Sequence, residues 1–298
     1  MSRKFCFQAF LDNDRYVILQ DLTFALYKEF LKVLMDNNPT VINFFIDDII
    51  EKCYVKSNFD FDINKLTIFD KLIILLMIKS YSVASDVKFN ITCAETEKLF
   101  NTTVSVTELY ILLLQCDMNT SYHYTDNNVK VHFSLPREFK EFNKEDIIYD
   151  CVTSIELKGK EIDIINADVI ERLPASIIGG FKTFLDNENK KITSSPIITY
   201  KSPFSPSDKK TEVYISLFDS SIIETVKLFF ETDLLDLYET EYLLIKEHNF
   251  SQDLFENKSA AEMFAYISII DKFREKEEAV STPGFVGAPL ETGVDNLE

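Results

Sequence analysis

The chain has 298 residues, of which 46% are hydrophobic, enough for one large or two medium domains with a substantial core. Its 49 acidic and 31 basic residues give a formal net charge of −18, so its field repels phosphate backbones and anionic lipid head groups. We therefore expect no direct binding to nucleic acid or membranes. The most apolar window, residues 72–78, is far shorter than the roughly 20 residues of a membrane-spanning helix.

Cysteine and glycine usage excludes further classes of protein. The five cysteines are scattered and no secretory leader is recognisable, which indicates a reducing compartment. Only six glycines occur, and the first is Gly159. Dinucleotide-binding folds and P-loops need glycines early in a strand-turn-helix unit, so neither is expected. The pair Gly179 and Gly180 is expected to mark a kink or break in a helix.

Residues 1–85 are predicted to form an N-terminal helical region. Apolar residues recur at helical spacing in residues 21–38 and again in residues 40–54, which predicts two amphipathic helices. Thr67 and Asp70 have the spacing of a capping box at the start of a third helix. Because this helix is apolar almost all round, we expect it at the centre of the core.

The apolar period then changes from about 3.6 to 2, which is typical of strands. In a first β module, residues 86–150, we expect residues 88–92 to pair with 102–106, a further strand at 129–135, and His123 in a polar loop.

A second module, residues 151–275, is predicted to contain a hairpin followed by helices. The expected elements are a hairpin at 154–164, a helix at 167–185, a strand-turn-strand unit at 196–217, a long helix from 218 toward 247, and a last helix that begins at a capping box formed by Ser259 and Glu262. Residues 276–298 are predicted to be a flexible acidic tail. The fold class is therefore α+β, with N-terminal helices, small β modules with two knuckle-like hairpins, and long C-terminal helices.

The two knuckle-like turns are candidates for a metal site. The first turn carries Cys93 and Thr96, and the second carries Ser202 and Ser205 with a proline between them. A zinc ribbon has thiolates at all four places, and one thiolate cannot hold a structural zinc ion. We therefore expect no metal and no cofactor, and the turns are either related to each other or two unrelated hairpin tips.

Cys93 could also act as a nucleophile with His123 or His132 as its base. No orienting third group or glycine turn for an oxyanion accompanies them in the sequence, and a free cysteine is commonly a small core hydrophobe. His248 lies near the end of a predicted helix, and carboxylate pairs such as Asp47-Asp48 fit a solvated face. We therefore expect a protein that is not an enzyme.

The order of segments resembles the baseplate hub subunit family of T4-type contractile-tailed phages. The resemblance covers roughly residues 20–275 and rests on four stretches, TIFDKLIILLMIKSYSV (67–83), VKVHFSLP (129–136), DIIYDCVTSIELKGKEI (146–162) and IIETVKLFFETDLLDLYETEYLLIKEHNFS (222–251). It implies a structural or assembly component of the tail baseplate, located in the virion and made in the host cytoplasm, whose partners are other baseplate and tail proteins. An assembly chaperone that leaves before the virion is finished is the alternative, and a cytosolic metal-dependent hydrolase with a degenerate ribbon is a third class.

Partner contacts are expected at the C-terminal helices and in the tail. The helical candidates cover more than one face, so some of them need a partner within or outside the chain: Phe229, Phe230, Leu234 and Leu235. In the tail, a stretch with prolines could dock in extended form through Phe285, Val286 and Leu290, or the tail only solubilises the chain. Oligomeric state is not predicted.

Overall fold

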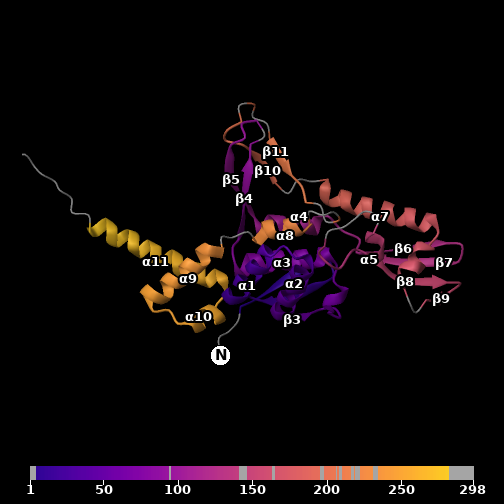
Figure 1. Ribbon diagram of the computed structural model, residues 1–298, viewed down its shortest axis with the longest axis horizontal. Coiled ribbons are helices and arrows are strands. Elements are labelled where there is room, and N and C mark those ends of the chain that lie inside the picture. The colour runs from indigo at the N-terminus through magenta and orange to yellow at the C-terminus, as the bar shows by residue number, and fades with distance from the viewer. Residues whose placement is uncertain are drawn as a thin grey trace, which may run out of the picture.

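The computed structural model combines helices with four small antiparallel sheets, which confirms the α+β class. It describes residues 5–93, 95–140, 146–162, 165–194, 198–205, 207, 210–215, 218, 222–230 and 234–281. A central body carries an upright projection, a lobe on one side and a helical arm on the other (Figure 1).

The body contains four α-helices, a short 3-10 helix and a three-stranded sheet. Its elements are β1 (Cys6–Phe10), β2 (Tyr16–Gln20), α1 (Phe24–Met35), α2 (Pro39–Cys53), β3 (Tyr54–Ser57), the 3-10 helix η1 (Ile63–Lys65), α3 (Ile68–Ser82) and α4 (Val106–Gln115). The predicted capping box is confirmed, because Thr67 and Asp70 bond each other's backbone amides at the start of α3. Thirteen of the fifteen residues of α3 are buried, so this helix forms the centre of the core as expected.

The N-terminal region was expected to be helical, but the structure begins with two paired strands. Phe7 and Ala9 on β1 point into the core and alternate with exposed neighbours, and β1 pairs with β2 in antiparallel register. Burial of every second residue is typical of a strand that packs one face on the core and exposes the other. Helix α4 was not predicted from the sequence either.

The lobe is a four-stranded sheet in the order β6-β7-β8-β9, packed with α7. Its elements are β6 (Ser121–Asp126), β7 (Val129–Ser134), α5 (Ile147–Cys151), β8 (Val152–Leu157), β9 (Lys160–Glu161), α6 (Ala167–Glu171) and α7 (Ala175–Thr193). His123 lies on β6, not in a loop, and pairs with His132 on β7. Strands β7 and β8 are hydrogen-bonded across residue 150, where a domain boundary was expected, so the first and second β modules share this sheet.

Helix α7 runs through Gly179 and Gly180 without the expected break. A Cβ atom on Gly180 would lie 2.6 Å from Cδ2 of Tyr124 on β6. A Cβ atom on Gly179 would have no atom of the described residues within 4 Å, its own helix backbone and chain neighbours aside. Gly180 therefore allows the sheet to approach the helix backbone closely.

The projection consists of two hairpins that are far apart in the sequence. Strands β4 (Asp86–Thr92) and β5 (Leu99–Ser105) form the first, as predicted, and β10 (Ile198–Lys201) and β11 (Lys210–Val213) form the second. The two hairpins stand side by side above the body (Figure 1).

The C-terminal helices are α8 (Ile222–Phe230), α9 (Leu234–His248), α10 (Gln252–Asn257) and α11 (Ala260–Ser281). The expected long helix is thus described as two, α8 and α9. The capping box of the last helix is confirmed, because Ser259 Oγ accepts a hydrogen bond from the Glu262 amide at 3.2 Å and the Glu262 carboxylate accepts one from the Ser259 amide. Helix α11 continues to Ser281, which corrects the expectation that helical structure ends near Glu275. The rest of the expected tail lies outside the described residues.

Candidate partner-binding surface

The structure separates the four helical candidates for partner contact. Phe229 and Phe230 at the end of α8 are each only 1% exposed, and the Phe230 ring meets the Phe30 ring edge-on at 5.0 Å. They pack in the chain's own core, which is one of the two partners expected for them. Leu234 packs against the core, whereas Leu235 is 64% exposed. Phe285, Val286 and Leu290 lie outside the described residues.

Leu235 begins an exposed apolar stripe along α9. The stripe consists of residues spaced by three or four along one face, Leu235, Tyr238, Tyr242 and Ile245, and all are exposed. Helix α11 has a second stripe of the same kind, formed by Tyr266, Ile269 and Phe273. We call the two stripes together the arm surface. Sequence reasoning found only Leu235 of this set, because apolar residues on both faces of a helix do not show which face a neighbouring helix covers.

Helices α9, α10 and α11, which form the arm, are joined firmly to α1. The Phe24 ring lies 5.6 Å from the Phe255 ring and 6.3 Å from the Phe264 ring, and the Phe24 amide donates to the Lys258 carbonyl at 2.8 Å. Lys28 on α1 forms an ion pair with Glu241 on α9. These contacts hold the arm against the body, and the side chains of the two stripes stay exposed beside them.

Two tyrosines of the arm surface are ordered by lysines. The ammonium groups of Lys28 and Lys32 lie 4.9 Å and 5.6 Å from the centre of the Tyr238 ring. Lys246 lies 5.1 Å from the Tyr242 ring and donates to its hydroxyl at 2.8 Å. Ordered aromatic side chains lose little conformational entropy on binding, which favours their use as anchors at an interface.

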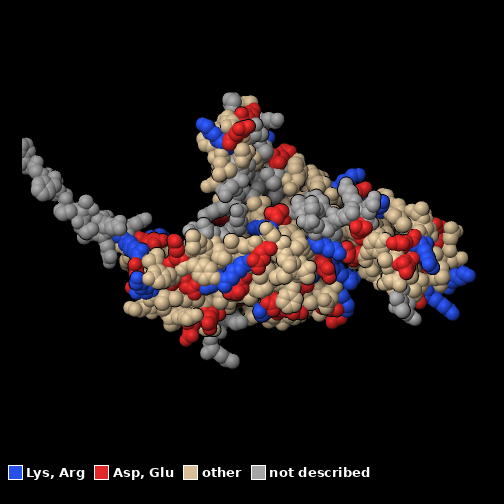
Figure 2. Space-filling model, in the orientation of Figure 1, with Lys and Arg blue, Asp and Glu red and all other residues tan. Residues whose placement is uncertain are grey.

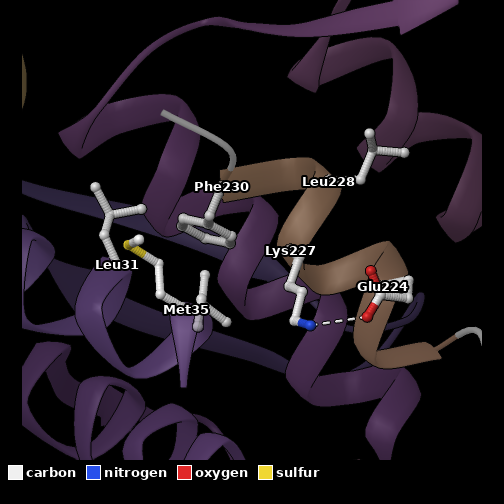
Figure 3. A pocket seen from close by; sticks show the side chains of 7 residues that line it. Leu31, Met35, Glu224, Lys227, Leu228 and Phe230 are labelled. Atoms are coloured by element: carbon white, nitrogen blue, oxygen red, sulfur yellow. Dashed lines mark hydrogen bonds and ion pairs between the residues drawn. The ribbon is translucent and has the colours of Figure 1, made fainter. Parts of the chain in front are cut away.

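A small apolar pocket lies between α1 and α8, about 280 Å³ in volume. Leu31, Met35 and Phe230 line one side of it, and Lys227 and Glu224 form an ion pair of 2.8 Å at its other side (Figure 3). The charges of Lys227 and Glu224 neutralise each other. The pocket therefore offers mainly apolar surface, and this ion pair leaves no unpaired charge in it.

The other candidate residues do not come together as an active site. The nearby hydroxyl groups of Ser202 and Thr96 lower the pKa of the Cys93 thiol to about 7, and no imidazole is among the groups that shift it. His132 Nε2 lies 3.1 Å from the Glu156 carboxylate on the neighbouring strand of the lobe. Among the described residues, no group of three or more His, Cys, Asp or Glu side chains could hold a metal ion. Within the same residues, no helix is long and apolar enough to cross a membrane.

A comparison of the sequence with protein families decides the identity of the chain. The family described as T4 bacteriophage base plate protein matches residues 4–235. The chain belongs to the T4 bacteriophage base plate protein family. Membership implies a place in the phage tail and contacts with other tail proteins. No curated protein and no solved structure matches the chain.

The matched region covers the body, the projection and the lobe of this baseplate protein, and ends at the second residue of α9. It begins and ends earlier than the stretch of residues 20–275 that carries the resemblance. Most of the arm lies beyond it, so the case for binding at the arm surface rests on the surface itself.

Proposed function

We propose that this chain is a non-enzymatic component of the baseplate hub and that it acts through contacts with other tail proteins. The observation that carries the proposal is the arm surface, which consists of two exposed apolar stripes on adjacent helices. The chain that exposes this surface belongs to a phage baseplate family. Exposed apolar patches of this kind mark interaction sites.

The occupant that fits the arm surface is a different tail protein with an apolar centre and a basic rim. Acidic residues outnumber basic ones in residues 234–281 and in the whole chain, which has a net charge of −18. On the face drawn in Figure 2, acidic side chains lie along both the body and the arm. Two copies of such a surface repel each other, whereas a basic rim is attracted to it and speeds association.

The role in the finished particle is tested by counting. Quantitative mass spectrometry of purified virions and of isolated baseplates should detect this chain at a fixed ratio to the other baseplate proteins. A chain present in infected cells and in baseplate intermediates but missing from purified virions would instead be an assembly chaperone.

The expected domains stay part of the proposal in a modified form. The body, the projection, the lobe and the arm are four units through which the chain can touch several neighbours at once. The tail residues Phe285, Val286 and Leu290 remain a predicted second contact in extended form. Deleting residues 282–298 should reduce incorporation into baseplates without lowering the unfolding temperature, and normal incorporation would make the tail a solubilising segment only.

A further inference from the structure

The tip of the projection brings together two turns that lie in different hairpins. Cys93 directly follows the last residue of β4, and Ser202 directly follows the last residue of β10. Each turn has its second polar side chain three residues later, at Thr96 and Ser205. Counted from the end of the preceding strand, the two polar side chains therefore occupy the same positions, the first and the fourth, in both turns.

Short backbone hydrogen bonds close both turns. The Glu97 amide donates to the Cys93 carbonyl at 2.8 Å, and the Ser205 amide donates to the Ser202 carbonyl at 3.2 Å. The Ser202 hydroxyl also accepts a hydrogen bond from the Phe204 amide at 3.1 Å. Cys93 and Ser202 are only 2% and 4% exposed, so their side chains face the inside of the tip.

Side chains join the turns to each other. The Ser202 hydroxyl of the second turn lies near the Cys93 thiol of the first and lowers its pKa. Glu95 of the first turn accepts hydrogen bonds from Ser205 and Ser207 of the second. The Phe100 ring of the first hairpin also packs against two rings of the second, Tyr200 at 5.2 Å and Phe204 at 6.4 Å. The ammonium group of Lys98 lies 5.2 Å from the centre of the Phe204 ring.

This is the arrangement in which two zinc knuckles hold one ion. Each knuckle supplies two thiolates from a turn after a strand, and the four sulfur atoms surround the metal tetrahedrally. Here three of the four positions are hydroxyls, which are not ligands of structural zinc. Ser205 is hydrogen-bonded to Glu95 of the opposite turn, whereas Thr96 Oγ1 is buried and has no hydrogen-bond partner among the described residues.

We propose that the tip is a metal-free counterpart of a two-knuckle zinc centre, in which Cys93, Thr96, Ser202 and Ser205 still occupy convergent ligand positions. Hydrogen bonds to Glu95 and the contacts of Phe100 with Tyr200 and Phe204 join the hairpins where a zinc ion would otherwise do so. The chain as it stands needs no metal, and thiols at the other three positions create a closed tetrahedral site.

The test is zinc and cobalt binding by the triple variant Thr96→Cys/Ser202→Cys/Ser205→Cys of the full chain, purified under reducing conditions. We expect one equivalent of zinc, the absorption of tetrahedral thiolate-bound Co²⁺, and a higher unfolding temperature with zinc than with a chelator. The matched control, Thr96→Cys/Ser202→Cys/Thr103→Cys, has the same number of thiols and should bind zinc at least about tenfold more weakly, because Thr103 pairs with Lys88 on the hairpin away from the tip. Wild-type protein should bind no stoichiometric zinc.

A folded triple variant without metal, a control that binds equally well, or stoichiometric zinc in the wild type would each overturn the proposal. A disulfide test covers the case in which the triple variant does not fold. The single variant Ser202→Cys, treated with diamide, should form a disulfide with Cys93, with loss of one hydrogen from each thiol to the oxidant. Thr103→Cys, on β5 away from the tip, should form far less of such a disulfide, and equal yields from the two variants would also contradict convergence.

Discussion

The ammonium nitrogen of Lys79 lies 5.3 Å from the centre of the Phe230 ring, and both side chains are buried. Lys79 is on α3 and Phe230 ends α8, so the contact joins the centre of the core to the start of the C-terminal helices. Burial disfavours the charged form and lowers the pKa of Lys79 from 10.5 to about 8. The aromatic ring offsets part of this cost through its attraction for the cation.

Replacing this lysine by an apolar residue of similar length should therefore stabilise the protein. A lowering of the pKa from 10.5 to about 8 corresponds to about 3 kcal/mol at neutral pH. Lys79→Met should raise the free energy of unfolding by about 1 to 3 kcal/mol at pH 7. The gain should be smaller than the full cost of burial because the substitution also removes the favourable contact of the ammonium group with the Phe230 ring. Chemical denaturation of both proteins measures the difference.

The pH dependence identifies the cause of this stabilisation. Below pH 8 both the folded and the unfolded wild-type chain hold the proton, so the cost of the buried charge is fully present. Between about pH 8 and 10.5 the unfolded chain holds more protons than the folded chain, so Lys79 destabilises less as pH rises. The advantage of Lys79→Met should shrink over this range. An advantage that stays constant to pH 10.5 would show that packing, not charge, is responsible.

The two adjacent glycines of α7 should respond in opposite directions to alanine. No atom lies near a Cβ on Gly179, so Gly179→Ala should stabilise the helix by up to about 1 kcal/mol. Gly180→Ala places its Cβ 2.6 Å from the Tyr124 ring and should destabilise by about 1 to 3 kcal/mol through overpacking. Equal effects of the two substitutions on the free energy of unfolding would mean that the close approach of β6 to α7 is not maintained in solution.

Serine should be tolerated at Cys93 and not at Cys151. Cys93 lies among hydroxyl groups that can bond another hydroxyl, so Cys93→Ser should lower the unfolding temperature by no more than about 3 °C and leave incorporation into baseplates unchanged. Burial raises the pKa of the Cys151 thiol, and Cys151→Ser should cost about 1 to 3 kcal/mol because its hydroxyl lies in the apolar core. Loss of incorporation by a folded Cys93→Ser protein would restore the nucleophile hypothesis.

The helices of the body and the first hairpin could be predicted from the sequence because their signals are local. Capping boxes at Thr67 and Ser259 act within four residues, and the apolar stripe of α1 repeats at helical spacing. Strand β1 was missed because a five-residue strand beside a helical region gives a weak signal, and α4 was missed because a continuous apolar run has no clear period.

Contacts between distant segments could not be predicted in the same way. Ser205 bonds Glu95 across 110 residues, and only the shared spacing of the two turns hinted at their relationship. The apolar pattern of α8 and α9 predicted that some residues need partners. It could not show that Phe230 packs on Phe30 while Leu235 stays exposed, since that depends on which helix faces α1.

The proposed role in the baseplate requires a tail protein to bind at the arm surface. The decisive measurement is the amount of this chain, relative to other tail proteins, in baseplates purified from phage that carry Leu235→Asp/Tyr242→Asp. Both side chains are exposed, so the variant should keep its unfolding temperature to within a few degrees, yet its incorporation should fall at least about tenfold. Phe44→Asp changes an exposed apolar residue on α2, 71% exposed and outside the arm, and should incorporate normally. Wild-type levels of the double variant in purified baseplates would contradict the claim that the arm binds a tail protein.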